Sequence, residues 1–130
     1  MSILHLTQEK KWFDMTAEGI KKEEYRHIKP YWVNRLLTYS HTMSHEDWYP
    51  DELCKELLKF PHDWDTTIQL YGGKFRKFEC VQSRNGYGKN APVIKWTHIR
   101  VRVGSPNPEW CPPEFHGQTF FILEIGEIIK

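Results

Sequence analysis

The sequence predicts an α+β fold: a small, mostly antiparallel β-barrel of five to six strands with helices on its side. The first observation is an order of elements in which helical patterns fill the first half and strand patterns the second. The second is a length of 130 residues without repeats or linkers, which favours a single domain over residues 1–130. The third is a 39% hydrophobic and 15% aromatic composition, which is enough to build a core.

In the first half, residues 3–7 (ILHLT) are expected to form a short strand, after which Thr7 can cap a helix over residues 8–18. Gly19 then supplies the left-handed end of that helix. Residues 21–28 alternate in polarity, which predicts an extended segment rather than a second helix. Two further helices are predicted from their apolar spacing, PYWVNRLL (30–37) and YPDELCKELLKF (49–60).

The second half alternates between β-forming runs and clusters of Gly, Pro and Asn. Four strands are predicted there: TTIQLY (66–71), KFRKFECVQS (74–83), VIKWTHIRVRV (93–103) and TFFILEIGEII (119–129). In the third of them, Ile99, Val101 and Val103 alternate with Arg100 and Arg102, which predicts a half-buried strand with a basic outer face. We expect this sheet to curl into a barrel, with the helices on its open side.

The charge distribution argues against a strong nonspecific nucleic-acid binder, because the formal net charge is only +1. Residues 74–102 nevertheless contain eight Lys and Arg against one Glu, a net charge of +7, which predicts a local patch that can meet phosphate. The sequence shows no membrane-spanning run, no signal-peptide pattern and no C-x-x-C, so we expect a cytoplasmic protein with reduced thiols and no membrane partner. His41 and His45 lack an H-E-x-x-H context, so neither a metal nor a cofactor is expected.

The stretch EGIKKEEYRHIKP (18–30) contains the most informative spacing in the chain. Gly19, Lys21, Glu24 and Arg26 form the pattern G-x-K-x-x-E-x-R. Period-two alternation places Glu24 and Arg26 on one face of the strand, with Lys21 at the turn before it. If these side chains face a cleft, their opposite charges compensate each other's burial. The alternative is an exposed edge strand with surface ion pairs.

This pattern, placed directly after the first helix, resembles the signature of the activating signal cointegrator homology (ASCH) domain family, which has a PUA-like β-barrel. The resemblance implies a PUA-like fold and a cleft lined by Lys21, Glu24 and Arg26. It also implies RNA or a modified nucleoside or nucleotide as the partner. In the family's bacterial acetylcytidine amidohydrolases, the Lys of the motif, a Thr three residues later and a distant Glu carry the hydrolysis. Here Glu24 stands at the Thr position, and a carboxylate cannot replace a hydroxyl in that role.

Two loops hold further candidate ligand-binding residues. SRNGYGKN combines Arg84 with a Gly-containing loop whose backbone N–H groups can come close to an anion, while Asn85 can read a base edge and Tyr87 can stack on a base. The alternative for this loop is a hairpin turn built on Asn-Gly. In PEWCPP, Glu109 can accept a hydrogen bond from an exocyclic amine while Trp110 stacks on the ring, and the alternative is a Trp that covers the core.

These features predict an RNA- or nucleotide-binding domain. The alternative is a hydrolase acting on acylated nucleosides or on RNA, in which Glu24 or Glu109 is the general base and Lys21 stabilises an oxyanion. A third hypothesis is an interaction module whose aromatic surface binds protein. A cleft sized for one base would favour a nucleoside enzyme, whereas a basic groove across Arg100 and Arg102 would favour RNA binding.

Overall fold

Two sheets and four α-helices form the part of the chain that the computed structural model describes, residues 2–39 and 48–129. The α-helices are α1 (Lys10–Ala17), α2 (Pro30–Leu36), α3 (Pro50–Lys59) and α4 (Trp64–Leu70). The strands are β1 (Ile3–Gln8), β2 (Glu23–His27), β3 (Leu37–Tyr39), β4 (Gly73–Phe75), β5 (Cys80–Asn85), β6 (Val93–Gly104) and β7 (Phe120–Ile129). Three single turns of 3₁₀ helix are η2 (Pro61–Asp63), η3 (Pro108–Trp110) and η4 (Pro113–Phe115). Within these described ranges, no helix combines the length and apolar character needed to cross a membrane.

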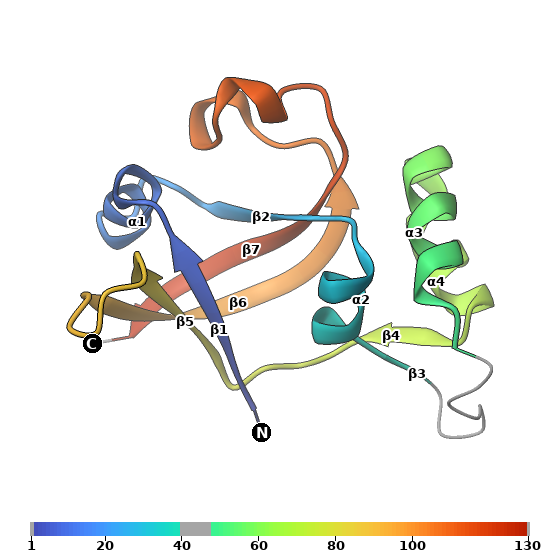
Figure 1. Cartoon of the computed structure of the whole chain (residues 1–130), viewed down its shortest axis with the longest axis horizontal. Helices are drawn as coiled ribbons and strands as arrows, with labels where there is room; N and C mark the ends of the chain where they lie inside the picture. Colours follow the sequence, from blue (N-terminus) through green and yellow to red (C-terminus); the bar gives the residue numbers. More distant parts are fainter. Residues whose placement is uncertain (1, 40–47, 130) are drawn as a thin grey trace.

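The larger sheet has the strand order β1-β5-β6-β7-β2 and curls into a half-barrel (Figure 1). Three of its strand pairs are antiparallel, as expected, but β1 runs parallel to β5, so the sheet is mixed. The expected curling of the sheet is observed, but the sheet stops at a half-barrel and does not complete the barrel, because β1 and β2 are its two edges. Arginine side chains bridge the gap instead: Arg26 donates to the carbonyl of Thr7 at 3.0 Å, and Arg35 donates to that of His5 at 2.9 Å.

The predicted elements of the first half are confirmed, apart from the start of the first helix. Strand β1 continues to Gln8 and Glu9 is the residue that precedes α1, so Thr7 does not cap that helix. Gly19 has φ of 77° and ends the helix as predicted, because the left-handed region costs glycine little. The extended segment that follows is β2.

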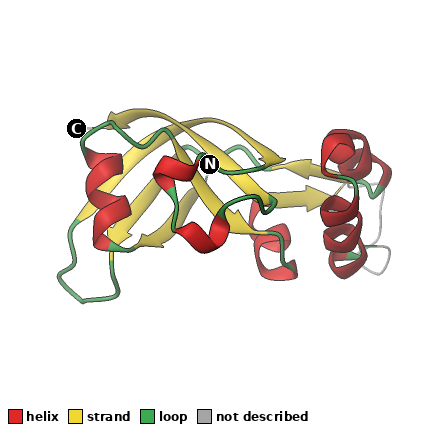
Figure 2. Cartoon of the chain, turned by 90° about the horizontal axis from the view of Figure 1, so that it is seen from above, coloured by secondary structure: helices red, strands yellow, loops and turns green. Residues whose placement is uncertain are grey.

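Residues 66–71 were expected to be a strand, but most of them belong to helix α4. Trp64 and Ile68 are four residues apart, so a helix turns both toward the main core, whereas Leu70 is 80% exposed. Burial on one helical face therefore outweighs the β-propensity of the Thr-Thr-Ile run. Helices α3 and α4 lie together at one end of the molecule, beside β3 and β4 (Figures 1 and 2). The expected strand over residues 74–83 is divided into β4 and β5.

Strand β6 keeps only part of the predicted alternation. Val101 and Val103 are buried, but a register irregularity between His98 and Val101 leaves Ile99 69% exposed. The arginines between them are neutralised: Arg102 contacts Glu23 at 2.6 Å and Glu124 at 2.8 Å, and Arg100 contacts Glu124 at 3.0 Å. The outer face of β6 is therefore a network of ion pairs rather than a basic groove.

The core is divided between two clusters of buried side chains. The main cluster lies between the sheet and the helices and includes Val33, Leu36, Leu53, Leu57, Val81, Trp96, Phe121 and Leu123. A smaller cluster contains Tyr25, Cys111, Phe120 and Ile122, with Trp110 and Phe115 packed against it. This cluster joins β2 and β7 to residues 105–119, which we call the covering loop. Figure 1 shows the covering loop in orange beyond β2. The smaller cluster thus fixes the covering loop next to the open side of the sheet.

Candidate functional site: a pocket at the gap in the sheet

The candidate site is a pocket where β1, β2, the start of α1 and the covering loop meet. Its cavity volume is about 170 Å³, several times the roughly 30 Å³ share of one liquid water and below the roughly 300–1,000 Å³ of pockets for drug-sized ligands. It is lined by Thr7, Gln8, Glu9, Trp12, Glu24, Tyr25, Arg26, Trp110, Cys111, Pro112 and Phe115. A space of this size suits one small, flat ring.

A buried carboxylate, Glu24, lies at the wall of this pocket and is only 6% exposed. Its Oε1 accepts hydrogen bonds from Lys21 Nζ at 3.3 Å and from the backbone N–H of Tyr25 at 3.0 Å. Its Oε2 accepts from Arg26 Nη2 at 3.1 Å. The predicted alternation is confirmed, since Glu24 and Arg26 form an ion pair and Lys21 lies within reach of the same carboxylate.

Electrostatics keep Glu24 ionised. Burial by itself would raise the pKa of this carboxyl, but the charges of Lys21 and Arg26 and the N–H of Tyr25 outweigh burial and hold the pKa below its ordinary value. A general base works best with a pKa near the pH of the reaction. A carboxyl that stays charged well below neutrality is better suited to accept hydrogen bonds from a ligand.

Lys21 supports the carboxylate from behind and is not among the residues that line the pocket. It is 1% exposed, donates to the carbonyl of Glu23 as well as to Glu24, and lies 4.7 Å from the centre of the Tyr25 ring. These contacts engage the ammonium fully. Lys21 therefore neutralises Glu24 without reaching the open space of the pocket.

Two buried polar atoms of pocket residues lack hydrogen-bond partners among the described residues. They are Gln8 Oε1 and Arg26 Nε. Leaving such an atom unpaired costs about 1–3 kcal/mol, so each requires an explanation, and a binding site is one. The orientation of the Gln8 amide is fixed, because its Nε2 donates to the Thr16 hydroxyl, whose own proton goes to the carbonyl of Trp12.

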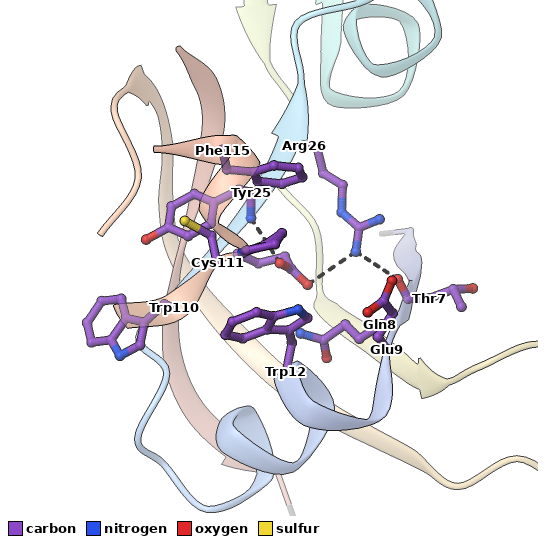
Figure 3. Close-up of a pocket in the computed structure, with 11 residues that line it drawn as sticks. Thr7, Gln8, Glu9, Trp12, Tyr25, Arg26, Trp110, Cys111 and Phe115 are labelled. Carbon is purple, nitrogen blue, oxygen red and sulfur yellow. Dashed lines mark hydrogen bonds and ion pairs between the residues drawn. The ribbon is translucent and has the colours of Figure 1, made fainter. Parts of the chain in front are cut away.

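Aromatic rings form the remaining walls. Figure 3 shows the ring of Trp12, from α1, and the ring of Phe115, from the covering loop, on opposite sides of the pocket and each nearly edge-on. Phe115 is held in place by stacking on Phe120, with ring centres 4.5 Å apart. Trp110 adds a third aromatic side chain. Opposed rings beside a carboxylate and a guanidinium suit a flat heterocycle that carries N–H groups.

Tyr25 ties the covering loop to β2. Its hydroxyl donates to Glu23 Oε1 at 2.6 Å and accepts from the backbone N–H of Asn107 at 2.9 Å. Burial, together with the hydrogen bond to Glu23, raises the pKa of the Tyr25 hydroxyl above its ordinary value, so it remains a neutral donor. The wall that contains Phe115 therefore has a polar anchor as well as apolar packing.

The residues predicted from the sequence fall into two groups. Glu24, Arg26 and Trp110 line this pocket, and Lys21 lies behind it as the ion-pair partner of Glu24. Those placed elsewhere are Arg84, Asn85, Tyr87 and Glu109. Glu109 is exposed and borders a neighbouring cavity of about 470 Å³, separate from Glu24. Tyr87 is 91% exposed, and the N–H of Asn85 donates to the carbonyl of Pro92, as in the hairpin alternative for that loop.

Sequence reasoning missed Trp12 and Phe115 as pocket residues. Trp12 was hidden because a Trp on an amphipathic helix is ordinarily part of the core. Phe115 follows two prolines in a long loop, which was a usable signal, since such loops often carry function. The contribution of Thr7 and Gln8 depends on the sheet remaining open at β1, and no local pattern predicts that.

Among the described residues, no group of three or more His, Cys, Asp or Glu side chains is arranged to hold a metal ion. His41 and His45 lie outside the described residues. Comparisons of the chain with protein-family models, with curated proteins and with solved structures find no match. The geometry of the pocket is therefore the basis on which a function is proposed.

Proposed function

We propose that this chain is an ASCH-like, PUA-like domain that binds one base of a nucleoside, a nucleotide or RNA in the pocket at the gap in the sheet. The observation that carries the proposal is the buried, ionised Glu24 beside Arg26 in a cavity walled by Trp12 and Phe115. A base inserted there stacks on aromatic rings and presents its amino or ring N–H groups to the carboxylate. Stacking of this kind contributes about 1–3 kcal/mol per base.

The size of the cavity favours a single base over a polynucleotide track. At about 170 Å³ it holds one ring system, so any strand that binds must turn one base out of its stack. The ion-paired Arg100 and Arg102 do not supply a continuous basic groove across the sheet. Recognition of a base edge thus explains the site better than nonspecific backbone binding does.

The direct test is a titration of single nucleosides, including N4-acylated cytidine, followed by tryptophan fluorescence. Trp12→Leu should weaken binding roughly 5- to 150-fold through the loss of stacking. Arg26→Ala should weaken it as well, because Glu24 loses the partner that orients it. Tyr87→Leu is the control, since it also replaces an aromatic side chain by Leu, at a position that is 91% exposed and outside the pocket. Equal affinity of the wild type and Trp12→Leu for every nucleoside would overturn the proposal.

The same incubations, analysed by mass spectrometry, separate binding from turnover. Unchanged nucleoside supports a binding domain. A deacylated nucleoside or cleaved RNA would instead establish the hydrolase alternative, and loss of that product in Lys21→Met would place Lys21 in its machinery. The lowered pKa of Glu24 and the full engagement of Lys21 favour the binding outcome.

A further inference from the structure

A second pocket adjoins the first one along β1. It has a volume of about 310 Å³ and is lined by His5, Leu6, Thr7, Arg35, Gln82 and Arg84. Thr7 borders both pockets, so the two spaces share a wall. No carboxylate is among the lining residues of the second pocket, whereas two guanidinium groups are.

The sheet register explains why these polar side chains gather. Parallel pairing of β1 with β5 aligns His5 with Gln82 and Thr7 with Arg84. The intervening Leu6 and Ser83 are buried, so the aligned pairs point to the outer side of the sheet. Arg35 reaches the same place from α2 and donates to the carbonyl of His5 at 2.9 Å.

Both arginines keep free hydrogen-bonding capacity. Arg35 uses two of its nitrogens, toward the Tyr31 hydroxyl at 2.8 Å and the carbonyl of His5, and Arg84 contacts the carbonyl of Gly88 at 3.1 Å. Each guanidinium has five N–H donors in a planar fork. Neither forms an ion pair within the described residues, whereas Arg26, Arg100 and Arg102 all do. Two uncompensated forks in one pocket match the oxygens of a phosphate.

The ring of Trp32 stiffens the connection between the two pockets. Its centre lies 5.1 Å from the guanidinium carbon of Arg26 and also 5.1 Å from that of Arg35. Stacking against an indole restricts the motion of a long cationic side chain. The N–H donors in the plane of the guanidinium remain available for hydrogen bonds. Arg35 is therefore held at a defined position relative to the base pocket.

We infer that the second pocket is a phosphate subsite, in which Arg35 and Arg84 bind the phosphate of a nucleotide whose base occupies the first pocket. This inference rests on the proposed function, because the base pocket defines what the phosphate is attached to. The ligand is then a nucleotide unit rather than a free nucleoside. The phosphate is either the terminal group of a mononucleotide or the phosphodiester of an RNA strand, and the chemistry recognised is the same.

The subsite can be tested without any base. Inorganic phosphate is titrated into the full chain while the arginine Nε–Hε signals are followed by NMR. The signals of Arg35 and Arg84 should shift and saturate, and that of the exposed Arg76, which lines neither pocket, should not. Equal shifts at all three arginines, or no shift at Arg35 and Arg84, would overturn the subsite. The phosphate titration tests the subsite alone, and the nucleoside titrations test the base pocket alone. A failure of one proposal can therefore be told apart from a failure of the other.

The second arm compares a nucleoside, its 5′-monophosphate, its 3′-monophosphate and a dinucleotide. At least one phosphorylated ligand should bind about tenfold more tightly than the nucleoside, because charge-assisted hydrogen bonds to Arg are strong. Tighter binding of a monophosphate identifies the terminal group as the source, and tighter binding of the dinucleotide alone identifies a strand. Arg84→Gln should remove this gain and leave nucleoside affinity unchanged, because Arg84 does not line the base pocket. Arg35→Gln should remove the gain as well.

Arg76→Gln is the matched control, since it makes the same change in net charge outside both pockets. Because Arg35 also contacts β1, its variant is interpreted only if its amide spectrum shows the native fold, and Arg84→Gln provides the test in either case. A phosphate gain that persists in Arg84→Gln, or that Arg76→Gln removes equally, would contradict the inference.

Discussion

At the scale of single residues, the site depends on charged side chains that are almost completely buried. Lys21 is 1% exposed and Glu24 6%, so each would be costly to bury alone. Together with Arg26 they form a compensated group with one more cation than anion. A buried ionic group of this kind adds little net stability over an apolar core, but breaking it is expensive. Its presence at a pocket wall is the reason for which we propose a role in recognition.

Glu24→Gln should lower the free energy of unfolding by about 3–5 kcal/mol, because it leaves Lys21 buried without a carboxylate. Urea unfolding at neutral pH measures this loss. Lys21→Met in the same chain should recover part of it, since the uncompensated ammonium is removed. Glu52→Gln is the control: its pair with Lys55 is exposed, so we expect a change of about 0.5 kcal/mol or less. Equal effects of the two Glu→Gln changes would contradict a compensated buried group.

The spacing of residues 18–30 was enough to predict this charged group, because strand alternation places Glu24 and Arg26 on one face. The aromatic walls were not predictable in the same way. Trp12 and Phe115 belong to elements about a hundred residues apart, and only the tertiary fold brings them to one pocket. A contact of that separation leaves no local pattern.

At the scale of elements, the hydroxyl of Tyr25 links the covering loop to β2. Tyr25→Phe should weaken base binding and speed amide exchange in residues 105–119, because the N–H of Asn107 loses its acceptor and Glu23 loses a donor. We expect a cost of about 1–3 kcal/mol in the free energy of unfolding. Hydrogen exchange followed by mass spectrometry measures the loop directly. Tyr31→Phe is the matched control, since Tyr31 is 60% exposed and lies on α2; faster loop exchange in both variants would contradict the assignment.

A glycine sets the pairing of the two longest strands. An added Cβ at Gly126, in β7, would lie 2.4 Å from Thr97 Oγ1 and 3.0 Å from the Thr97 carbonyl oxygen of β6. Gly126→Ala should therefore destabilise the protein by about 1–3 kcal/mol through overpacking and a lengthened strand contact. Thermal unfolding provides the measurement. Gly88→Ala is the control, because its Cβ would meet only Ala91 at 4.0 Å; a similar loss in both variants would exclude the close contact as the cause.

Most helices and strands were predictable from the periodicity of apolar residues and from the Gly, Pro and Asn clusters between them. The exceptions have physical causes. The segment 66–71 has β-branched residues but adopts a helix, because a helix buries Ile68 and packs Trp64 against the same core. Ile99 leaves the alternation of β6 because of the irregularity after His98. Both deviations are set by partners elsewhere in the chain, which local propensity does not register.

At the scale of the whole molecule, stability should fall as the solution is acidified. Burial lowers the pKa of His27 and of His98 below the ordinary 6.5, and the pKa values of Glu24 and Glu124 lie below the ordinary 4.5. For each of these groups the unfolded chain binds protons more readily. The free energy of unfolding should therefore decline below about pH 6.5, where the histidines of the unfolded chain take up protons, and again below about pH 4.5, where its glutamates do. Above pH 6.5 the histidines and the glutamates both contribute their full stabilisation.

Denaturant titrations across this pH range measure both steps. His98→Gln should reduce the upper step, because Gln can still accept the hydrogen bond that Phe78 N–H gives to His98 Nε2 but does not titrate. His62→Gln, at an exposed position in η2, is the control and should leave that step unchanged. An unfolding free energy that rises on acidification from pH 7 to 5 would contradict the assignment.

The overall α+β class and the helix-to-strand order were predictable from the sequence, whereas the closure of the sheet was not. Parallel pairing of β1 with β5 joins segments about 75 residues apart in the chain, and nothing in ILHLT specifies that partner or direction. The open gap at β1 follows from this pairing, and the pocket follows from the gap. The least predictable feature of the topology therefore creates the candidate site.

The bridging of β1 by Arg26 and Arg35 also bears on self-association. An edge strand whose carbonyls are unoccupied is a template on which another chain can add a strand, and this is a route to aggregation. In this protein the carbonyls of Thr7 and His5 already accept hydrogen bonds from arginines of the same chain. Arg26 and Arg35, which border the two pockets, thus also cap this edge strand against pairing with another chain.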